Sequence, residues 1–210
     1  MIKIYFSQPL NTSSNLHKLP LVLQQHIAKR KQKHKQLLSL TGYWMLQQVL
    51  EKDFGTTLES LVFLDSGKPI LKGYDIYFSI SHSKNLVGLV ISTSGNIGLD
   101  IEPFRKFEKV ASAFSFFSKA EQDFILASPQ PERSLIELWS KKEALIKALG
   151  SQMFDDASKT DVRFSTGTCT GQHFFFKSIL VGAQYDFDGE IWVAASFPID
   201  KVHIDAFFSL

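Results

Sequence analysis

The stretch Ile97-Gly98-Leu99-Asp100-Ile101-Glu102-Pro103 decides how this chain of 210 residues is expected to fold. Apolar and acidic residues alternate along it, and successive side chains of a β-strand point to opposite faces. Leu99 and Ile101 should therefore enter a core, while Asp100 and Glu102 leave together on the other face. Their Cα atoms would lie roughly 6–7 Å apart, so both carboxylates could approach one ion. The stretch predicts a strand that carries a carboxylate pair.

A third acid follows on a predicted helix. Apolar residues recur mostly at helical spacing between about 132 and 149. On this helix Trp139, Glu143 and Lys147 fall at i, i+4 and i+8 on one slowly turning face, with Lys142 beside it. An ordinary surface pair of Glu and Lys gives the same pattern, so the helix alone does not indicate a site.

Three acids with nearby lysines suggest a hydrated metal ion beside a phosphorylated substrate. Magnesium suits such a site, because it prefers oxygen ligands, keeps several waters and usually combines one or two carboxylates with substrate phosphates. A zinc site is not expected. Cys169 is the only cysteine, and no His-x-x-x-His pair stands near a third ligand.

Five short motifs occur in order along the chain. They are Gly67-Lys68-Pro69, Phe78-Ser79-Ile80-Ser81-His82-Ser83, Gly98-Leu99-Asp100-Ile101-Glu102, Phe117-Ser118-Lys119-Ala120-Glu121 and Trp139-x-x-Lys142-Glu143-x-x-x-Lys147. Each motif is weak by itself, but the ordered set resembles the 4′-phosphopantetheinyl transferases, and in particular their larger, surfactin-type branch. The resemblance implies an α+β fold in which two similar α/β halves form a pseudo-dimer with antiparallel sheets and packed helices.

We expect the two halves to comprise residues 1–97 and 98–210, with the active site at the seam between them. Strand and helix patterns are compatible with this division. In the first half we predict strands near 2–6, 61–64, 76–81 and 86–92 around a helix from about 32 to 52. In the second half we predict a strand at 97–102, helices near 108–127 and 132–149, and strands near 161–165, 173–180, 183–188 and 190–196. Ser118 with Glu121 suggests a capping box.

The resemblance implies transfer of the phosphopantetheine arm of coenzyme A to a serine hydroxyl of an apo acyl or peptidyl carrier protein, with release of adenosine 3′,5′-bisphosphate. Asp100, Glu102 and Glu143 match the magnesium-binding acids of the family, and Mn²⁺ is an alternative ion. Glu143 is the candidate base for the serine proton, directly or through a metal-bound water. Lys147 matches the phosphate-contacting lysine and could stabilise the leaving bisphosphate. Whether Glu143 acts as ligand, base or both stays open.

Further residues are expected to bind coenzyme A. Ser81 and His82 match the nucleotide-contacting Ser-His of the family, and Lys68 matches its coenzyme A-contacting lysine, although Gly-Lys-Pro alone is an ordinary turn. Lys142 matches another motif position and is expected to support binding. The basic run Arg30, Lys31 and Lys35 is predicted, as a group, to meet the 3′-phosphate, because its register does not match the family cleanly.

Composition agrees with this interpretation. The formal net charge of +2 argues against an overall electrostatic attraction to nucleic acid. The opening residues lack the apolar core of a signal peptide, and no run approaches the roughly 20 apolar residues of a membrane span. A single cysteine is typical of a reducing compartment. We therefore expect a cytoplasmic monomer.

Two other functions are compatible with the same residues. A coenzyme A- or carrier-binding module could keep the fold without turnover, although the complete set of acids argues against it. A magnesium-dependent phosphohydrolase is a less favoured alternative, since carboxylates with lysine also suit that chemistry. The motifs do not report which carrier protein is modified.

Overall fold

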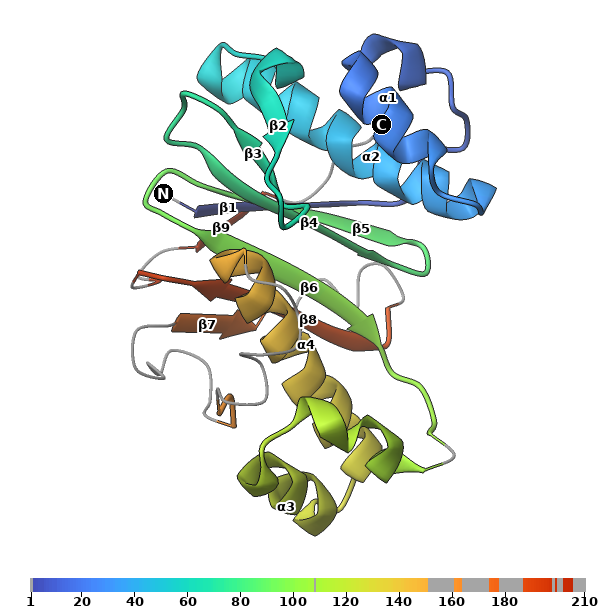
Figure 1. Cartoon of the computed structure of the whole chain (residues 1–210), viewed down its shortest axis with the longest axis vertical. Coiled ribbons are helices and arrows are strands. Elements are labelled where there is room, and N and C mark those ends of the chain that lie inside the picture. Colours follow the sequence, from blue (N-terminus) through green and yellow to red (C-terminus); the bar gives the residue numbers. More distant parts are fainter. Residues whose placement is uncertain are drawn as a thin grey trace.

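Two β-sheets lie face to face between two groups of helices in the computed structural model of the chain (Figure 1). The structure describes residues 2–107, 109–150, 161–163, 174–177, 187–197, 199 and 202–205. Helices α1 and α2 cover the outer face of one sheet, and α4 covers the outer face of the other, with α3 packed against α4 (Figure 1). The predicted α+β class with antiparallel sheets and packed helices is thus confirmed.

The first sheet has the strand order β4-β5-β1-β9. Its first three strands in the chain are β1 (Ile2–Ser7), β4 (Tyr77–Ser83) and β5 (Leu86–Ser92). Between β1 and β4 the chain forms α1 (Leu21–Ala28), α2 (Lys33–Val49) with a π-helical turn (Leu50–Phe54), and a separate small hairpin of β2 (Leu61–Phe63) and β3 (Pro69–Leu71). Short 3₁₀ turns occupy Leu16–Lys18 and Leu58–Ser60. Strand β9 (Val202–Asp205) pairs in parallel with β1. A strand from the end of the chain therefore joins the sheet of the first half.

The second sheet has the order β6-β8-β7, with both pairings antiparallel. Its elements are β6 (Ile97–Pro103), β7 (Phe174–Lys177) and β8 (Gly189–Ala195), and the helices on its outer side are a 3₁₀ helix (Val110–Phe116), α3 (Lys119–Ala127) and α4 (Pro131–Leu149). Among the helices of the described segments, none has the length and apolar character that crossing a bilayer requires.

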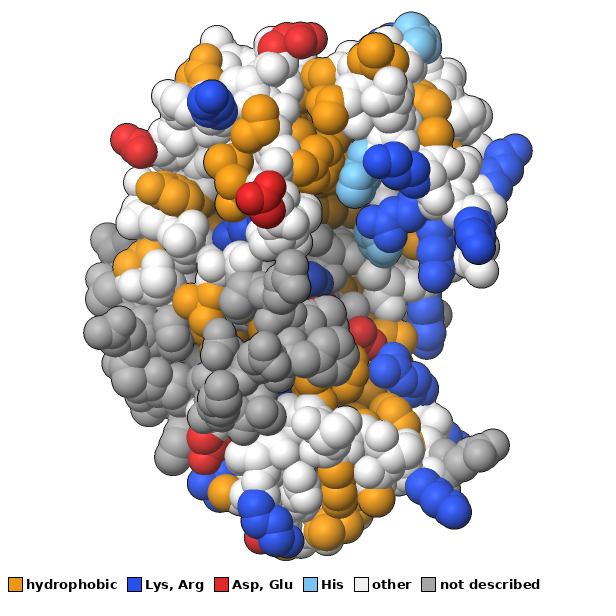
Figure 2. Space-filling model, in the orientation of Figure 1, with side chains coloured by type: hydrophobic (Ala, Val, Ile, Leu, Met, Phe, Trp, Pro, Cys, Tyr) orange, Lys and Arg blue, Asp and Glu red, His pale blue; other side chains and the backbone are white. Residues whose placement is uncertain are grey.

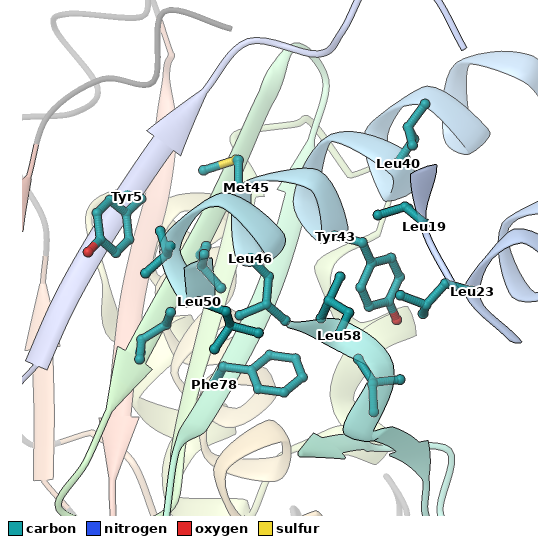
Figure 3. Close-up of a cluster of buried hydrophobic side chains, with 14 of the residues drawn as sticks. Tyr5, Leu19, Leu23, Leu40, Tyr43, Met45, Leu46, Leu50, Leu58 and Phe78 are labelled. Atoms are coloured by element: carbon teal, nitrogen blue, oxygen red, sulfur yellow. The ribbon is translucent and has the colours of Figure 1, made fainter. Parts of the chain in front are cut away.

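Three apolar cores hold these layers together. The first lies between α1, α2 and the first sheet, and Figure 3 shows Tyr43 and Leu46 of α2 in the same cluster as Phe78 of β4. The second lies between the two sheets and includes Leu99 and Ile101, as their alternation with the acids predicted. The third lies between the second sheet and its helices. Because β6 contributes to the inter-sheet core, its acidic face is turned toward α4.

Up to residue 149 the predicted strands and long helices are present, except between residues 108 and 127, while α1, β3 and β9 were not predicted. Over residues 108–127 the expected single helix is wrong, because Phe117 and Ser118 are extended and separate the 3₁₀ helix from α3. Ser118 begins α3 with the predicted capping box: its side chain accepts from the N–H of Glu121, and Glu121 accepts from the N–H of Ser118. The cap requires non-helical backbone at Ser118, which explains the break.

Several predictions concern the end of the chain. Strands 173–180 and 190–196 correspond to β7 and β8. Residues 161–163, where a strand was predicted, belong to no strand, and residues 164–165 lie outside the described residues. The strand expected at 183–188 falls mostly outside them too, and its described part, 187–188, is not a strand. Cys169 also lies outside the described residues.

Candidate active site

Gly98 allows α4 to lie directly on strand β6. A Cβ atom at Gly98 would come within 1.9 Å of the carbonyl oxygen of Ala144 and 2.5 Å of the amide nitrogen of Ala148. Any side chain at this position would push the helix away, because backbone atoms cannot move aside like a flexible side chain. The close approach brings Glu143 and Lys147 of α4 next to Asp100, two residues farther along the strand.

Asp100 is the most completely enclosed of the predicted metal ligands, with 3% of its surface exposed. Its Oδ1 accepts from Lys147 Nζ at 2.6 Å and from Ser81 Oγ at 3.3 Å. Its Oδ2 accepts from Ser140 Oγ at 2.9 Å. A buried carboxylate is costly unless it is paired and hydrogen-bonded, and these contacts from β4 and α4 meet both needs.

Two serines of β4 connect the first sheet to β6. Ser79 Oγ accepts from the N–H of Leu99 at 3.1 Å, and Ser81 Oγ accepts from the N–H of Ile101 at 3.2 Å. These contacts satisfy backbone donors at the edge of the second sheet, which would otherwise be buried without partners. The Ser-x-Ser-His motif therefore fixes β4 beside the carboxylate strand as well as lining the site.

Within the described segments, Glu102 and Glu143 accept fewer hydrogen bonds than Asp100 does. Glu102 accepts from Arg105 at 2.8 Å, while burial and the nearby charge of Asp100 raise its pKa. Burial raises the pKa of Glu143 to about 7, and Asp100 and Glu102 contribute to this shift while Lys147 opposes it. The buried Oε1 of Glu143 has no hydrogen-bond partner in the part of the chain that the structure describes. Of the three acids, Glu143 is thus the one whose ionised form the site favours least.

These side chains surround one open hollow, which we call the acidic hollow. Its lining is Arg30, Ile80, Ser81, His82, Asp100, Ile101, Glu102, Trp139, Glu143 and Lys147. It combines Arg30 and residues of β4 with residues of β6 and α4. Trp139, Glu143 and Lys147 line it together, which agrees with their predicted common helix face.

A second pocket adjoins the acidic hollow and shares Arg30, Ile80, His82 and Lys147 with it. Lys68 lines this adjoining pocket and donates to the carbonyl of Ala148 at 2.9 Å, and burial lowers its pKa. Burial also lowers the pKa of His82 to about 4, so its ring is neutral near pH 7. The structure thus brings Lys68, His82, Arg30 and Lys147 together around one pocket.

Other predicted binding residues lie elsewhere. Lys142 is buried in an ion pair with Glu121, whose Oε2 is 3.0 Å from Lys142 Nζ, and both side chains are fully enclosed. It lines neither the acidic hollow nor the adjoining pocket. The geometry therefore does not support direct contact of Lys142 with coenzyme A. Lys31 lines a separate hollow between α1 and α2, and Lys35 lines none of these pockets.

Basic side chains nevertheless surround the entrance. Figure 2 shows Lys and Arg side chains gathered where α1 meets α2 and along the hollowed edge of the molecule below it. Every residue from Lys29 to Lys35 is exposed. Arg105 and Lys106, which follow β6, are exposed too. Such a rim favours the approach of an anionic ligand.

The acids of the hollow have the donor chemistry of a magnesium site, although cations now contact two of them. Within the described residues, no group of three or more His, Cys, Asp or Glu side chains is placed to hold a metal ion as they stand. Lys147 lies against Asp100 and Arg105 against Glu102 in this conformation. The donor chemistry still fits, because magnesium needs only one or two protein carboxylates and the buried Oε1 of Glu143 accepts no hydrogen bond from the described residues.

Sequence reasoning missed three polar neighbours of the acids. Ser140 and Arg105 contact Asp100 and Glu102 directly, and Ser79 holds the backbone of β6. Ser140 precedes Glu143 by three residues, so helical spacing could have placed it on the same face. Arg105 follows the end of β6 in the chain, where no periodic pattern indicates its direction.

Comparison with known proteins agrees with these motifs. Residues 96–194 match the model of the family described as the 4′-phosphopantetheinyl transferase superfamily. A 4′-phosphopantetheinyl transferase, AcpT, of Salmonella typhi is 31% identical over 123 residues, which are 55% of this chain and 62% of that protein. The 4′-phosphopantetheinyl transferase gsp of Aneurinibacillus migulanus is 32% identical over 120 residues, which are 55% of this chain and 49% of that protein.

A longer match covers nearly the whole chain. The uncharacterized protein YieE of Escherichia coli strain K12 is 26% identical over 208 residues, which are 95% of this chain and 82% of that protein. The chain spans about 62% of the length of the AcpT relative. These matches confirm the resemblance inferred from the motifs: residues 96–194 match the 4′-phosphopantetheinyl transferase superfamily, and the named transferases are similar to a little over half of the chain.

Proposed function

We propose that this protein transfers the 4′-phosphopantetheine group of coenzyme A to a serine hydroxyl of an apo acyl or peptidyl carrier protein and releases adenosine 3′,5′-bisphosphate. The observation that carries the proposal is the meeting of Asp100, Glu102, Glu143 and Lys147 with His82 of β4 around one hollow. All four lie within the region that matches the family model, and two relatives are named as transferases of this kind.

Coenzyme A would occupy the adjoining pocket with its pyrophosphate toward the acidic hollow. Lys68 and Arg30 supply positive charge on the walls of that pocket, and Lys147 lies where the two spaces meet. Cations near phosphate oxygens form strong charge-assisted hydrogen bonds. The neutral ring of His82 can donate one hydrogen bond without adding charge. The exposed Lys31 and Lys35 would contribute long-range attraction rather than direct contacts.

Asp100, Glu102 and Glu143 would hold a magnesium ion, or manganese in its place. When bound, the ion neutralises charge on the pyrophosphate and on the leaving group. Binding requires Lys147 and Arg105 to release carboxylate oxygens that they contact in this conformation. Lys147 would then be free to turn toward a phosphate of coenzyme A, which is the role that the resemblance implies.

Glu143 would accept the proton of the carrier serine. A general base works best when its pKa lies near the working pH, and the pKa of Glu143 is raised to about 7. The serine oxygen attacks the phosphorus that carries the pantetheine arm, and the bond from that phosphorus to the bridging pyrophosphate oxygen breaks. Lys147 would stabilise the negative charge that remains on the bisphosphate.

The proposal extends to architecture and setting. We infer that residues 1–97 and 98–210 are two halves of a pseudo-dimer, since each has a sheet covered by helices on its outer face. Strand β9, which belongs to the second half in sequence, would then pair with the sheet of the first half. We also infer that the protein acts as a monomer, because both halves already contribute to one site. A cytoplasmic location is inferred from the single cysteine, which is typical of a reducing compartment.

Product analysis separates this function from its alternatives. Purified chain is incubated with coenzyme A and magnesium, with and without a panel of apo carrier proteins, and the nucleotide products are separated by chromatography. The proposal predicts adenosine 3′,5′-bisphosphate only when a carrier is present. Breakdown of coenzyme A without any carrier would identify a hydrolase, while coenzyme A binding without products on every carrier would identify a binding module.

A further inference from the structure

Ser140 has a place in this site that no motif assigned to it. Its hydroxyl is fully buried on the side of α4 that faces β6, and it donates to Asp100 Oδ2 at 2.9 Å. The two carboxylate oxygens of Asp100 therefore have different hydrogen-bond partners. Oδ1 meets Lys147 and Ser81, while the Ser140 hydroxyl holds Oδ2.

The Asp100 carboxylate needs such a contact to have a defined plane. The terminal torsion of an aspartate side chain is broad, so rotamer preference alone does not fix the direction of its two oxygens. A hydrogen bond from a rigid helix residue does fix it. Gly98 keeps α4 in contact with β6, so the donor is held at a constant distance from the strand.

The chemical type of the donor also matters. A hydroxyl orients a carboxylate without neutralising it, whereas Lys147 both contacts Asp100 and compensates its charge. With Ser140 on Oδ2, the negative charge of Asp100 becomes available to a metal ion at Oδ1 once Lys147 has released that oxygen. Ser140 also lies one turn before Glu143 on the same helix, so it links the orientations of two of the predicted ligands.

We propose that Ser140 is a positioning residue that fixes the Asp100 carboxylate for magnesium binding. This inference rests on the proposed function, because it assumes that Asp100 is a magnesium ligand. Residues that orient metal ligands typically change metal affinity or activity by about 10–100-fold when they are removed. We therefore expect Ser140→Ala to raise the dissociation constant for magnesium by about tenfold.

Isothermal titration calorimetry of magnesium into the purified chain, with and without coenzyme A, measures this effect directly. Ser140→Thr restores a hydroxyl and is expected to stay within about threefold of the unaltered chain, since the hydrogen bond to Asp100 is retained. Ser140→Cys keeps the shape with a weaker donor and should lie between the two. The matched control is Ser134→Ala, which removes a hydroxyl from the same helix. Ser134 donates to Ser128 at 2.7 Å and does not line the acidic hollow, so its loss should leave the affinity unchanged.

Thermal unfolding of each variant separates positioning from loss of structure. The inference is overturned if Ser140→Ala and Ser140→Cys bind magnesium like the unaltered chain, or if Ser134→Ala weakens binding equally. Absence of magnesium binding to the unaltered chain overturns it as well. The proposed function fails separately, if the unaltered chain binds magnesium and coenzyme A but modifies no carrier.

Discussion

Lys147 Nζ lies 2.6 Å from Asp100 Oδ1, so one cation of helix α4 compensates the most enclosed acid of strand β6. The carboxylate side chain is 5% exposed and that of Lys147 is 31% exposed. The contact joins β6 and α4, the two elements that carry the predicted metal ligands. It also implies that Lys147 has a structural role in addition to its proposed contact with phosphate.

Replacement of Lys147 by Met should therefore lower stability as well as turnover. Asp100 would keep its serine contacts but lose its charge partner, which is expected to reduce the free energy of unfolding by about 1–3 kcal/mol. Urea unfolding measures the loss. Lys119→Met is a matched control, because Lys119 pairs with Asp123 at an exposed site and its loss should change stability by less than about 0.5 kcal/mol. Equal effects of the two substitutions would contradict the account.

The buried pair of Lys142 and Glu121 is expected to stabilise the fold rather than to bind coenzyme A. Lys142→Met would leave the carboxylate of Glu121 enclosed without its cation, at a cost of about 3–5 kcal/mol in urea unfolding. Combining it with Glu121→Gln should recover part of the loss, because the enclosed negative charge is removed. Recovery stays incomplete, because Glu121 accepts from the N–H groups of Ser118 and Val162 on separate oxygens, and glutamine keeps only one of these acceptors.

Enzyme kinetics on these variants distinguish the two roles of lysine. Lys142→Met should keep the KM for coenzyme A of the unaltered chain, whereas Lys68→Met should raise it, because Lys68 lines the adjoining pocket. A raised KM for Lys142→Met with unchanged stability would instead support the role that the motif suggested.

Gly98→Ala tests the close seating of α4. The added methyl group would overlap the Ala144 carbonyl oxygen, at 1.9 Å, so strand and helix must separate. Overpacking of this kind typically costs about 1–3 kcal/mol, and a backbone obstacle places this site at the upper end. Turnover should fall further than stability does, because Asp100 and Glu143 lie on the two separated elements. Unfolding at an unchanged urea concentration would show that the contact is looser than described.

Glu143→Gln should abolish turnover and yet make the metal-free protein more stable near neutral pH. The pKa of Glu143 is about 7 when folded, against an ordinary value of 4.5 for the unfolded chain. Between these values the unfolded chain ionises first, so the wild-type residue destabilises the fold increasingly as pH rises from 4.5 to 7. Urea unfolding in chelator from pH 4 to 8 should show the advantage of Glu143→Gln growing over that interval and then levelling off. An advantage independent of pH would refute the proposed ionisation.

Much of the fold was accessible to sequence reasoning because periodicity reports it. The alternation of Leu99 and Ile101 with the acids correctly predicted which side chains enter the inter-sheet core. Helical spacing likewise placed Glu143 and Lys147 on one face. The same spacing placed Lys142 beside them. Lys142 precedes Glu143 by one residue, which is about 100° of helix rotation. Its side chain therefore points away from the acidic hollow and pairs with Glu121.

Contacts between distant elements were not accessible in the same way. Nothing in the sequence near Ser79 and Ser81 indicates that their hydroxyls accept from the backbone of β6. The parallel pairing of β9 with β1 depends on where the chain returns in space. The break at Ser118 was visible as a capping box, yet the apolar residues before it favoured a continuous helix.

Intact mass spectrometry of an apo carrier protein incubated with the chain, coenzyme A and magnesium tests the central claim most directly. The account predicts a mass gain equal to one phosphopantetheine group on the carrier. The gain should disappear when magnesium is chelated, when Asp100 is replaced by Ala, and when the carrier serine is replaced by Ala. A carrier that stays unmodified across a panel of fatty-acid, polyketide and peptide-synthetase carriers, while coenzyme A remains bound to the chain, would contradict it.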